Sequence, residues 1–349
     1  MVFDDPDFDN HEQVIFCSDR DVGLQGIIAI HSTALGPAAG GCRMHPYTSP
    51  AAALTDVLRL SKGMSYKNAV AGLPLGGGKC VIISDPSTPA KPDLLRAFSK
   101  HVQSLAGRYW TAIDIGVGPA DADILAENCD YIFARASQYE EGFNPSSFTA
   151  LGGFTGVQAV TNHVWGRTDL QGLRVAIQGL GATGADLARL LHEAGAELVV
   201  SDIRDDVVRE IVQKYGATPA APDAIHAQDV DVFAPCAMGA IINDHSLPDI
   251  KAKAICGLAN NQLAEPRHGA ALRKANIAYV PDYVVNAGGM MGASTVIFDT
   301  PSRKASIARI HGLYDTIVQI LEVAKADRRP SSEVADEMAQ ATMNAAKSA

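Results

Sequence analysis

The segment LRVAIQGLGATG, from Leu173 to Gly184, decides the fold. A short apolar run typical of a buried strand is followed at once by Gly179, Gly181 and Gly184 in the spacing G-x-G-x-x-G, and a helical pattern comes next. In such a turn the first glycine permits the bend, the second lets a pyrophosphate approach the helix N-terminus, and the third allows close helix–strand packing. The segment therefore predicts a Rossmann sheet that binds a dinucleotide.

The choice of dinucleotide depends on the end of the next predicted strand, Ala196 to Ser201. Asp202 follows this strand, close to the offset of ~20 residues at which a carboxylate accepts the hydroxyl groups of an adenosine ribose. A carboxylate there repels a 2'-phosphate, so the sequence predicts NAD as the cofactor. Arg204 leaves NADP as an alternative.

Further buried-strand patterns follow the glycine segment and predict a doubly wound sheet. They are Val230 to Ala234, Ala254 to Gly257 and Ile277 to Val280. Apolar residues then recur at spacings of three and four from Ile307 to Ala324, which predicts one face of a single long helix.

The first part of the chain also alternates strands with helices. Strand patterns at Gly26 to Ile30, Cys80 to Ile83 and Trp110 to Ile115 are separated by two helical patterns, one that begins after Ser49 and one from Leu94 to Leu105. The stretches from His31 to Arg43 and from Gly72 to Gly78 are too rich in glycine to predict a regular element. The expected architecture is an N-terminal, mostly parallel α/β domain.

A polar stretch from Arg135 to Ser147 separates the two parts. We therefore expect an α/β protein with a substrate and catalytic domain at residues 1–135 and a Rossmann domain at residues 148–290. The C-terminal helices, residues 291–349, are expected to pack back towards the first domain.

Composition and charge exclude several classes of function. The 349 residues carry a net charge of -10, so no basic field exists to collect nucleic acid or an anionic membrane. No apolar run approaches the roughly 20 residues of a membrane helix, and the acidic N-terminus is unlike a signal peptide, which predicts a cytoplasmic protein. Six cysteines without a C-x-x-C pair and ten scattered histidines predict reduced thiols and no metal site.

Three lysines stand among apolar and glycine residues in KGMSYKNAVAGLPLGGGK, from Lys62 to Lys79. Burial and a like-charged neighbour both disfavour the ammonium form, so one lysine of a close pair can titrate near neutrality and act as a base. The alternative, exposed lysines that flank a turn, is equally compatible with the spacing. A phosphate loop is excluded, because Leu73 and Cys80 stand where glycine and a hydroxyl residue are required. No metalloprotease or serine hydrolase motif is present.

Three motifs resemble the leucine, phenylalanine, valine and tryptophan dehydrogenases of the Glu/Leu/Phe/Val family. These are LGPAAGGCRM (Leu35 to Met44), the lysine segment just quoted, and NAGG (Asn286 to Gly289). FAPCAMG (Phe233 to Gly239) and ANNQL (Ala259 to Leu263) are also similar to that family. The resemblance runs from about His11 to beyond Gly289. It implies NAD-dependent, reversible oxidative deamination of an L-amino acid to a 2-oxo acid and ammonia, by a homodimer or larger homo-oligomer.

The resemblance also implies roles for single residues. Lys79 and Asp114 match the catalytic lysine and its aspartate partner, and Lys67, with the backbone near Gly40 and Gly41, matches the group that holds the substrate carboxylate. Asn261 matches a residue that contacts the substrate, and Thr149 and Asn286 match residues that face the nicotinamide. The side-chain pocket of the family is matched by four further residues: Ala39, Ala112, Met290 and Ala293.

The pocket implied in this way carries no charge, which predicts an apolar substrate, with phenylalanine and other aromatic amino acids slightly above leucine. Met290 and its neighbours depart from the β-branched residues usual in relatives, so the preferred amino acid stays open. Two other functions are kept as alternatives. A glutamate-type dehydrogenase would need a cation for the second carboxylate, and an inactive NAD-binding sensor would be expected to lack Lys79 or Asp114.

Overall fold

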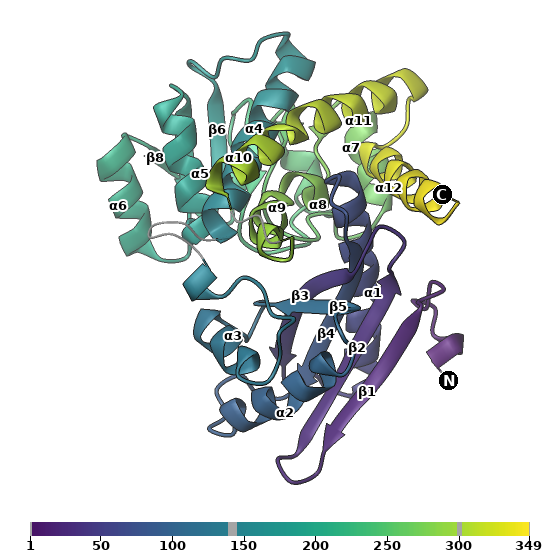
Figure 1. The fold of residues 1–349 in the computed structure, drawn as a ribbon. Coiled ribbons are helices and arrows are strands. Elements are labelled where there is room, and N and C mark those ends of the chain that lie inside the picture. Colours follow the sequence, from purple (N-terminus) through teal and green to yellow (C-terminus); the bar gives the residue numbers. More distant parts are fainter. Residues whose placement is uncertain (1, 139–144, 299–301, 349) are drawn as a thin grey trace. The chain divides into compact units, whose positions relative to one another are not determined.

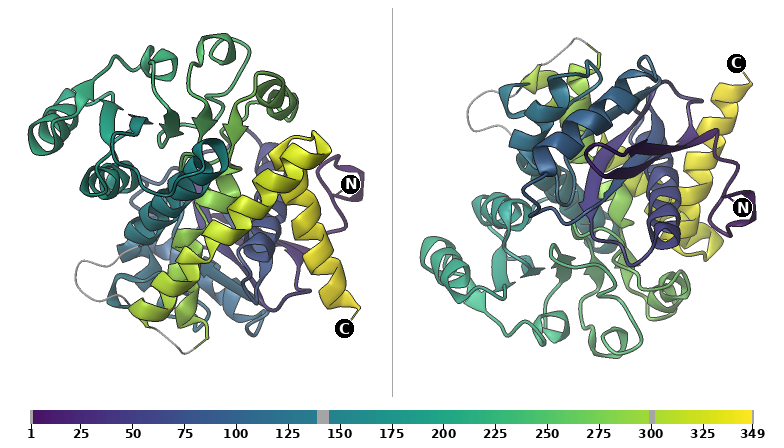
Figure 2. Two further views of the ribbon diagram at one scale, coloured as in Figure 1. Left: turned by 90° about the horizontal axis from the view of Figure 1, so that it is seen from above. Right: turned by 90° about the horizontal axis from the view of Figure 1, so that it is seen from below.

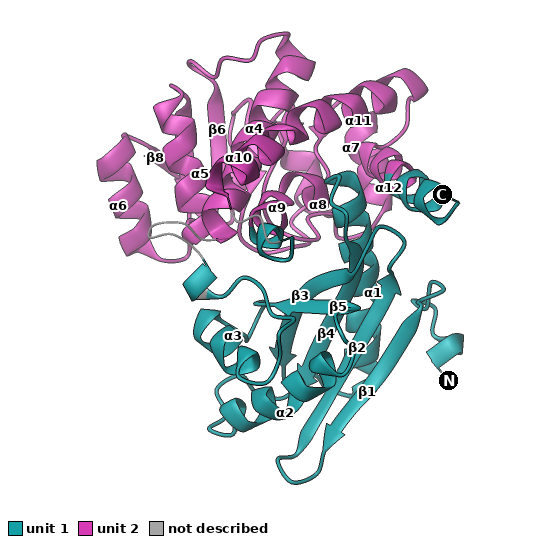
Figure 3. Cartoon of the chain, viewed as in Figure 1, with its two compact units in different colours: residues 1–144, 293–301, 339–349 teal, residues 145–292, 302–338 magenta. Residues whose placement is uncertain are grey.

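The computed structural model describes residues 2–138, 145–298 and 302–348, and the chain forms two compact units (Figures 1 and 3). Unit 1 comprises residues 1–144, 293–301 and 339–349, and unit 2 comprises residues 145–292 and 302–338. The C-terminal segment, residues 291–349, which was expected to pack back towards the first domain, is divided between the two units. Residues 139–144 of the predicted connection lie outside the described part of the chain.

Unit 1 contains a five-stranded sheet in the order β1-β2-β4-β3-β5. Its strands are β1 (Gln13–Asp19), β2 (Leu24–Ser32), β3 (Ala38–His45), β4 (Gly76–Ile83) and β5 (Tyr109–Ala112). The pairs β1/β2 and β2/β4 are antiparallel, whereas β3/β4 and β3/β5 are parallel. The α/β class is therefore confirmed, but within the described residues this sheet is evenly mixed rather than mostly parallel, because hairpin β1/β2 adds antiparallel pairing at one edge.

Helices cover both faces of this sheet (Figure 2). They are α1 (Pro50–Val70), α2 (Lys91–Gln103) and α3 (Pro119–Ala126). Side chains alternate along a strand, so Ile27 and Ala29 pack with Leu58 of α1, whereas Ile28 and Ile30 join the core beneath α2 and α3. Helix α1 begins as expected, since the Ser49 side chain accepts a hydrogen bond from the backbone N–H of Ala52.

Strand β3 corrects the expectation that residues from His31 to Arg43 form no regular element. Its glycines are compatible with a strand because neighbouring backbones approach them very closely: a Cβ on Gly40 would overlap the carbonyl oxygen of Gly78. Strand β4 likewise begins at Gly76, inside the stretch expected to be irregular. Glycine here marks close packing between strands rather than a break.

Unit 2 contains a six-stranded, wholly parallel sheet in the order β11-β10-β9-β6-β7-β8. The strands are β6 (Arg174–Gln178), β7 (Glu197–Ser201), β8 (Thr218–Pro219), β9 (Val232–Pro235), β10 (Ala254–Ile255) and β11 (Ala278–Tyr279). This topology confirms the predicted doubly wound sheet; only the short strand β8 has no counterpart among the predicted elements.

The helices of unit 2 include two that divide the apolar stripe predicted as one helix. Gly312 separates α10 (Arg303–His311) from α11 (Leu313–Asp327). The other helices are α4 (Pro145–Trp165), α5 (Ala182–Glu193), α6 (Asp205–Tyr215), α7 (Arg267–Lys274), α8 (Asp282–Val285), α9 (Gly288–Ala293) and α12 (Ser331–Lys347). Helices α9 and α12 each continue into unit 1. Every helix in the described residues is too short or too polar to cross a membrane.

Candidate functional site

An ion pair between a buried lysine and a half-buried aspartate joins two of the predicted site residues in unit 1. Lys79 lies in β4 and is 7% exposed, and its Nζ atom is 2.6 Å from Oδ2 of Asp114, which follows β5. The guanidinium of Arg43, in β3, donates from Nε to the same oxygen at 3.3 Å. One carboxylate oxygen thus accepts hydrogen bonds from two cations, a strongly charge-assisted arrangement.

The charges around Asp114 determine its protonation. Burial raises the pKa of this carboxyl group, but the nearby charges of Lys79 and Arg43 outweigh burial, and the pKa lies below its ordinary value. Asp114 is therefore a carboxylate at neutral pH. It can accept a proton only when the charge on one of its partners changes, and Lys79 is the partner that can lose a proton.

Arg43 is a site residue that sequence reasoning missed. Its Nη1 atom donates to Asp56 of α1 at 2.9 Å, and the Tyr47 hydroxyl donates to the same carboxylate at 2.5 Å. Arg43 is therefore held between Asp56 and Asp114 and fixes the position of the latter. The available signal was an arginine two positions after Gly41, in an otherwise apolar and glycine-rich stretch where a solvated cation is not expected.

Strand alternation places Ala39 and Ala112 on the face of the sheet that carries Lys79. In β3, Ala38 and Cys42 belong to the core beneath α2 and α3. Side chains alternate along a strand, so Ala39 lies on the opposite face, which is covered by α1 and which also carries Arg43. In β5, Tyr109 belongs to the core beneath α2 and α3. Ala112 is three residues further on and therefore lies on the face covered by α1. The paired residues Gly41 and Ala112 bring β3 and β5 together beside Asp114. A Cβ on Gly41 would lie 2.9 Å from the Cβ of Asp114.

Lys67 lies in the last turn of α1 and is half-buried. The following residue, Asn68, donates a hydrogen bond from Nδ2 to the carbonyl oxygen of Gly76 at 2.6 Å, which ties the end of α1 to the start of β4. Close packing supports this attachment, since a Cβ on Gly77 would overlap the backbone of Ser65. Lys67 and Lys79 are thus carried by two elements that pack directly on each other.

In unit 2 the glycine segment has the geometry of an anion-binding turn. Gly179 has φ +92°, a backbone conformation that favours glycine, and a Cβ on Gly184 would overlap the Gly179 carbonyl oxygen. Around Gly181, at the N-terminus of α5, a Cβ would meet no atom within 4 Å. The turn therefore leaves open space beside the helix N-terminus, where a pyrophosphate is stabilised.

Asp202 is fixed beside this turn. Its Oδ2 atom accepts a hydrogen bond from the backbone N–H of Leu180 at 2.7 Å, and Oδ1 accepts from Arg204 Nε at 3.1 Å. Burial raises the pKa of Asp202, but the hydrogen bonds from Arg204 and Leu180 outweigh it and lower the pKa. A carboxylate held in this way suits ribose hydroxyls, and the Arg204 cation is already paired with it.

Two other predicted residues of unit 2, Asn261 and Asn286, are connected through Asn260, and a third, Thr149, lies against Gly289. Asn286 Nδ2 donates a hydrogen bond to Asn260 Oδ1 at 2.8 Å. Asn261 follows Asn260 in the chain and has a φ angle of +54°. Asn286 Oδ1 is buried and accepts no hydrogen bond from the described residues. Thr149, in α4, faces Gly289, where a Cβ would overlap its Oγ1 atom. An orphaned buried amide oxygen is the kind of group a ligand donor would satisfy.

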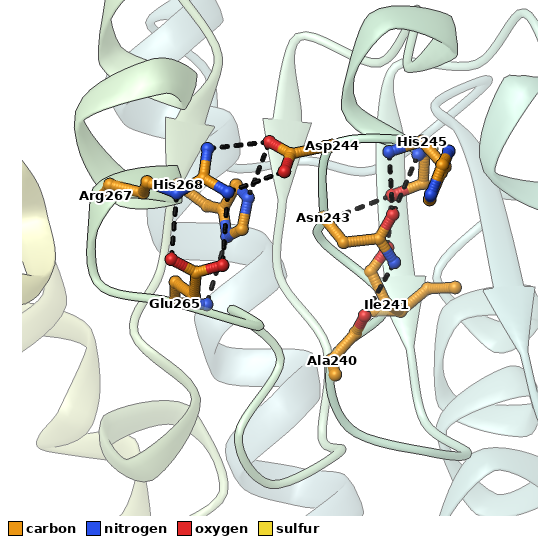
Figure 4. Close-up of polar contacts among 9 residues, drawn as sticks. Ala240, Ile241, Asn243, Asp244, His245, Glu265, Arg267 and His268 are labelled. Carbon is orange, nitrogen blue, oxygen red and sulfur yellow. Dashed lines mark hydrogen bonds and ion pairs between the residues drawn. The ribbon is translucent and has the colours of Figure 1, made fainter.

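The loop that carries Asn261 is anchored by a polar cluster (Figure 4). Arg267 donates to both oxygens of Asp244, at 2.7 and 2.5 Å, and to Glu265 at 2.9 Å. The His268 Nδ1 atom accepts from the Glu265 backbone, so its Nε2–H donates to Asp244 at 3.2 Å. Arg267 and His268 lower the pKa of Asp244 to about 2.

This cluster holds two neighbouring loops in register. The backbone N–H of Ala240 donates to the carbonyl oxygen of Asn261 at 2.6 Å, and that of Ile242 donates to Gln262 at 2.9 Å. The left-handed backbone of Asn261 is thus held by hydrogen bonds that its own carbonyl oxygen and that of Gln262 accept.

The last two predicted pocket residues, Met290 and Ala293, lie three positions apart in α9 and therefore on one side of that helix. Ala293 is buried and Met290 is half-buried.

The predicted site residues thus form three groups. Unit 1 brings together Lys79, Asp114, Ala39 and Ala112. Unit 2 brings together the glycine turn with Asp202 and, separately, Asn261 with Asn286. No cluster of three metal-ligating side chains occurs in the described residues.

Comparison with known proteins gives consistent matches along the chain. Residues 11–131 match the dimerisation domain of Glu/Leu/Phe/Val dehydrogenases, and residues 200–300 match the Glutamate/Leucine/Phenylalanine/Valine dehydrogenase domain. The chain is 45% identical to the leucine dehydrogenase of Geobacillus stearothermophilus, over 95% of this chain and 90% of that protein. It is 44% identical to the valine dehydrogenase of Streptomyces virginiae, over 97% and 95% of the two chains.

Among solved structures, the crystal structure of L-tryptophan dehydrogenase from Nostoc punctiforme superposes with a TM-score of 0.88. The two sequences are 39% identical, and the match covers 99% of this chain and 100% of the tryptophan dehydrogenase chain. Both the sequence and the fold of these proteins are therefore similar to those of the present chain over nearly its whole length.

Proposed function

The chain belongs to the Glu/Leu/Phe/Val dehydrogenase family and is an amino-acid dehydrogenase, and from this premise we propose its reaction. The protein removes the amino group of an apolar L-amino acid, with NAD as the hydride acceptor, and releases the 2-oxo acid and ammonia. The reaction is reversible. The observation that carries this proposal is the ion pair of Lys79 and Asp114, which unites a group able to lose a proton with one able to take it.

The residues of unit 1 support the proton transfers of this reaction. After hydride loss the amino acid is an iminium ion, and hydrolysis requires a base that deprotonates the attacking water. Lys79 is proposed to take this proton in its neutral form, and Asp114, whose Oδ2 atom is 2.6 Å from Lys79 Nζ, is proposed to assist the departure of ammonia. Arg43 keeps a positive charge beside Asp114 throughout, so the carboxylate is never left buried without a partner.

Lys67 is proposed to hold the substrate carboxylate. The ammonium group lies on the helix that packs on β4, and a lysine provides a point charge for a carboxylate. The backbone N–H groups of Gly40 and Gly41, in β3, are proposed to assist it, and Gly41 lies beside Asp114. Asn261 is proposed as a further substrate contact, positioned by its hydrogen-bonded loop.

The residues of unit 2 fit NAD. When bound, this cofactor takes up the hydride from the substrate. The open space beside Gly181 and the positive end of α5 suit its pyrophosphate, Asp202 suits the adenosine ribose, and the unsatisfied Oδ1 of Asn286 suits an amide donor. NADP fits less well, because Asp202 would face its additional phosphate.

The substrate is proposed to be apolar, because none of the four residues that the sequence predicts for its side-chain pocket is charged: Ala39, Ala112, Met290 and Ala293. A second carboxylate or an ammonium on the substrate would lose hydration without finding a partner. This disfavours the glutamate-type alternative, and the intact ion pair of Lys79 and Asp114 disfavours the inactive sensor. The match to a dimerisation domain supports a homo-oligomer.

The experiment is a panel of the twenty amino acids, each mixed with protein and NAD at alkaline pH, in which the absorbance of the reduced nicotinamide is followed. Apolar amino acids should give turnover, and glutamate, aspartate and lysine should give little. Lys100→Met, which removes an exposed lysine on α2, serves as a control that should match the parent. Absence of turnover with every amino acid, with NAD and with NADP, would contradict the proposal.

A further inference from the structure

Unit 2 contains a second candidate binding site, a cavity of about 510 Å³. Its walls come from the end of α4, from α7 and α11, from the start of α12, and from the residues that precede β10 and β11. It is lined by six basic residues and by no aspartate or glutamate: His163, Lys253, Arg273, Lys325, Arg328 and Arg329. Its volume is within the range of pockets that bind small molecules.

The cavity lies at the edge of the sheet opposite the glycine turn. Lys253 comes immediately before β10, and Asn276 and Ile277 come immediately before β11, so the cavity is at the amino ends of these strands. The glycine turn follows the carboxyl end of β6. In a parallel sheet these two ends are on opposite edges, and the cavity is therefore separate from the proposed dinucleotide site.

Only part of the positive charge in the cavity is neutralised by the protein. Arg329 contacts Glu333 and Glu337, and His163 contacts Glu322. Within the described ranges, no carboxylate lies within 4.0 Å of the side chains of the remaining four cations, Lys253, Arg273, Lys325 and Arg328. These four come from three different parts of the fold, in a chain whose net charge is -10.

A structural role explains some of these cations singly. Arg273 is in the last turn of α7 and Lys325 in the last turn of α11, where a cation stabilises the negative end of the helix dipole. This role does not require the two helix ends to share a cavity, nor does it account for Lys253, which precedes a strand. Like charges gathered around one space repel one another, and a bound anion would remove that repulsion.

The cavity is also preformed and has an apolar side. Ser331 donates a hydrogen bond to the Tyr279 carbonyl oxygen at 2.5 Å, and a Cβ on Gly269 would lie 2.9 Å from Ser332 Oγ, so α7, β11 and α12 are in close contact. Leu272, Ile277 and Leu321 line the same space. A ligand with several negative charges and a small apolar group would match both sides.

We propose that this cavity binds a small polyphosphate, either free or as part of a nucleotide, at a site distinct from the dinucleotide site. The four cations without a carboxylate partner supply the charge. The apolar wall of Leu272, Ile277 and Leu321 accommodates a nucleobase where one is present.

The test is titration calorimetry of the whole protein with tripolyphosphate and, separately, with ATP. Both titrations are carried out with NADH at saturation, so that the dinucleotide site is occupied and cannot bind the probe. The variant Arg273→Gln/Lys325→Gln removes two cations of the cavity. The control Lys274→Gln removes one from the same helix, at an exposed position that does not line the cavity.

We expect saturable binding of at least one probe to the parent, weakened by about tenfold or more in the double variant and by less than about twofold in the control. Turnover of amino acid should be preserved in all three proteins. If the double variant fails to fold, Lys253→Gln is measured in its place. Absence of saturable binding at millimolar probe, or equal binding by parent and variant, would overturn the proposal.

Discussion

Oδ2 of Asp114 accepts hydrogen bonds from both Lys79 and Arg43, so the carboxylate keeps a cationic partner whichever way the Lys79 proton moves. This arrangement separates two roles. Arg43, always protonated, holds Asp114 in place, whereas Lys79 is the group that can exchange a proton. It also means that Lys79 can be replaced without leaving a buried carboxylate unpaired, which makes the catalytic role testable in a folded protein.

Lys79→Met should lower kcat by about 10²- to 10⁴-fold, the usual contribution of a general acid–base group, because Lys79 is the only lysine in the described part of the chain that pairs with Asp114. NADH binding, followed by nicotinamide fluorescence, should be unchanged, since the proposed cofactor residues lie in unit 2. Lys100→Met serves as the control. Turnover of Lys79→Met within tenfold of the parent would exclude Lys79 as the base.

Lys67→Ala should act on substrate binding instead. Loss of the ammonium that pairs with the substrate carboxylate should raise KM for the amino acid by about tenfold or more, with a smaller effect on KM for NAD. Steady-state kinetics with each substrate varied in turn would check this. An unchanged KM for every amino acid turned over would remove Lys67 from the site.

The cofactor preference can be tested at Asp202. Parent protein should use NAD well and NADP poorly, and Asp202→Ser should narrow the ratio of their kcat/KM values by about tenfold, because the repulsion of a phosphate dianion is removed. Asp223→Ser, an exposed position, is the control. A parent that already prefers NADP would show that Arg204 outweighs Asp202.

Acid should destabilise the protein through His31. Burial lowers the pKa of His31 from 6.5 to about 4 in the fold, so the unfolded chain binds the proton more readily between these values. The contribution is therefore complete above pH 6.5 and is lost as pH falls towards 4, by up to about 1.4 kcal/mol per pH unit.

Urea unfolding at several pH values across this window would measure the effect. His31→Gln should show a shallower pH dependence than the parent, although its stability at pH 7 is lower because the contact of His31 Nδ1 with Ser65 Oγ, at 2.8 Å, is altered. His101→Gln, on α2, should keep the parent slope. Parallel slopes for the parent and His31→Gln would contradict the assignment.

Features that depend on a short stretch of sequence could be predicted, whereas features that depend on contacts between distant residues could not. The glycine turn and the strand end at Asp202 are local, and a dozen residues specify them. Strand β3 was missed because Gly40 and Gly41 fit a strand only when Gly78 of β4 and Ile113, which follows β5, approach them closely, and no local pattern reveals these contacts. Arg43 was missed for the same reason, since its partners Asp56 and Asp114 are distant in sequence.

The substrate preference depends on the size of the pocket, and Ala39 is the residue through which it can be tested. Ala39 is fully buried, lies between β4 and β5, and shares the sheet face of Lys79. Ala39→Leu adds three carbon atoms on this face. It should therefore reduce the space for an aromatic side chain more than for a branched aliphatic one.

Ala39→Leu should lower the ratio of kcat/KM for phenylalanine to that for leucine by about tenfold, since each buried methylene is worth roughly 0.8 kcal/mol in a matched pocket. Ala39→Gly, which enlarges the space, should leave the ratio unchanged or raise it. Both ratios are measured beside the parent, with thermal unfolding to verify the fold. A ratio that does not move in a folded Ala39→Leu protein would show that Ala39 does not line the pocket, and selectivity would then have to come from Met290 and Ala293 of α9.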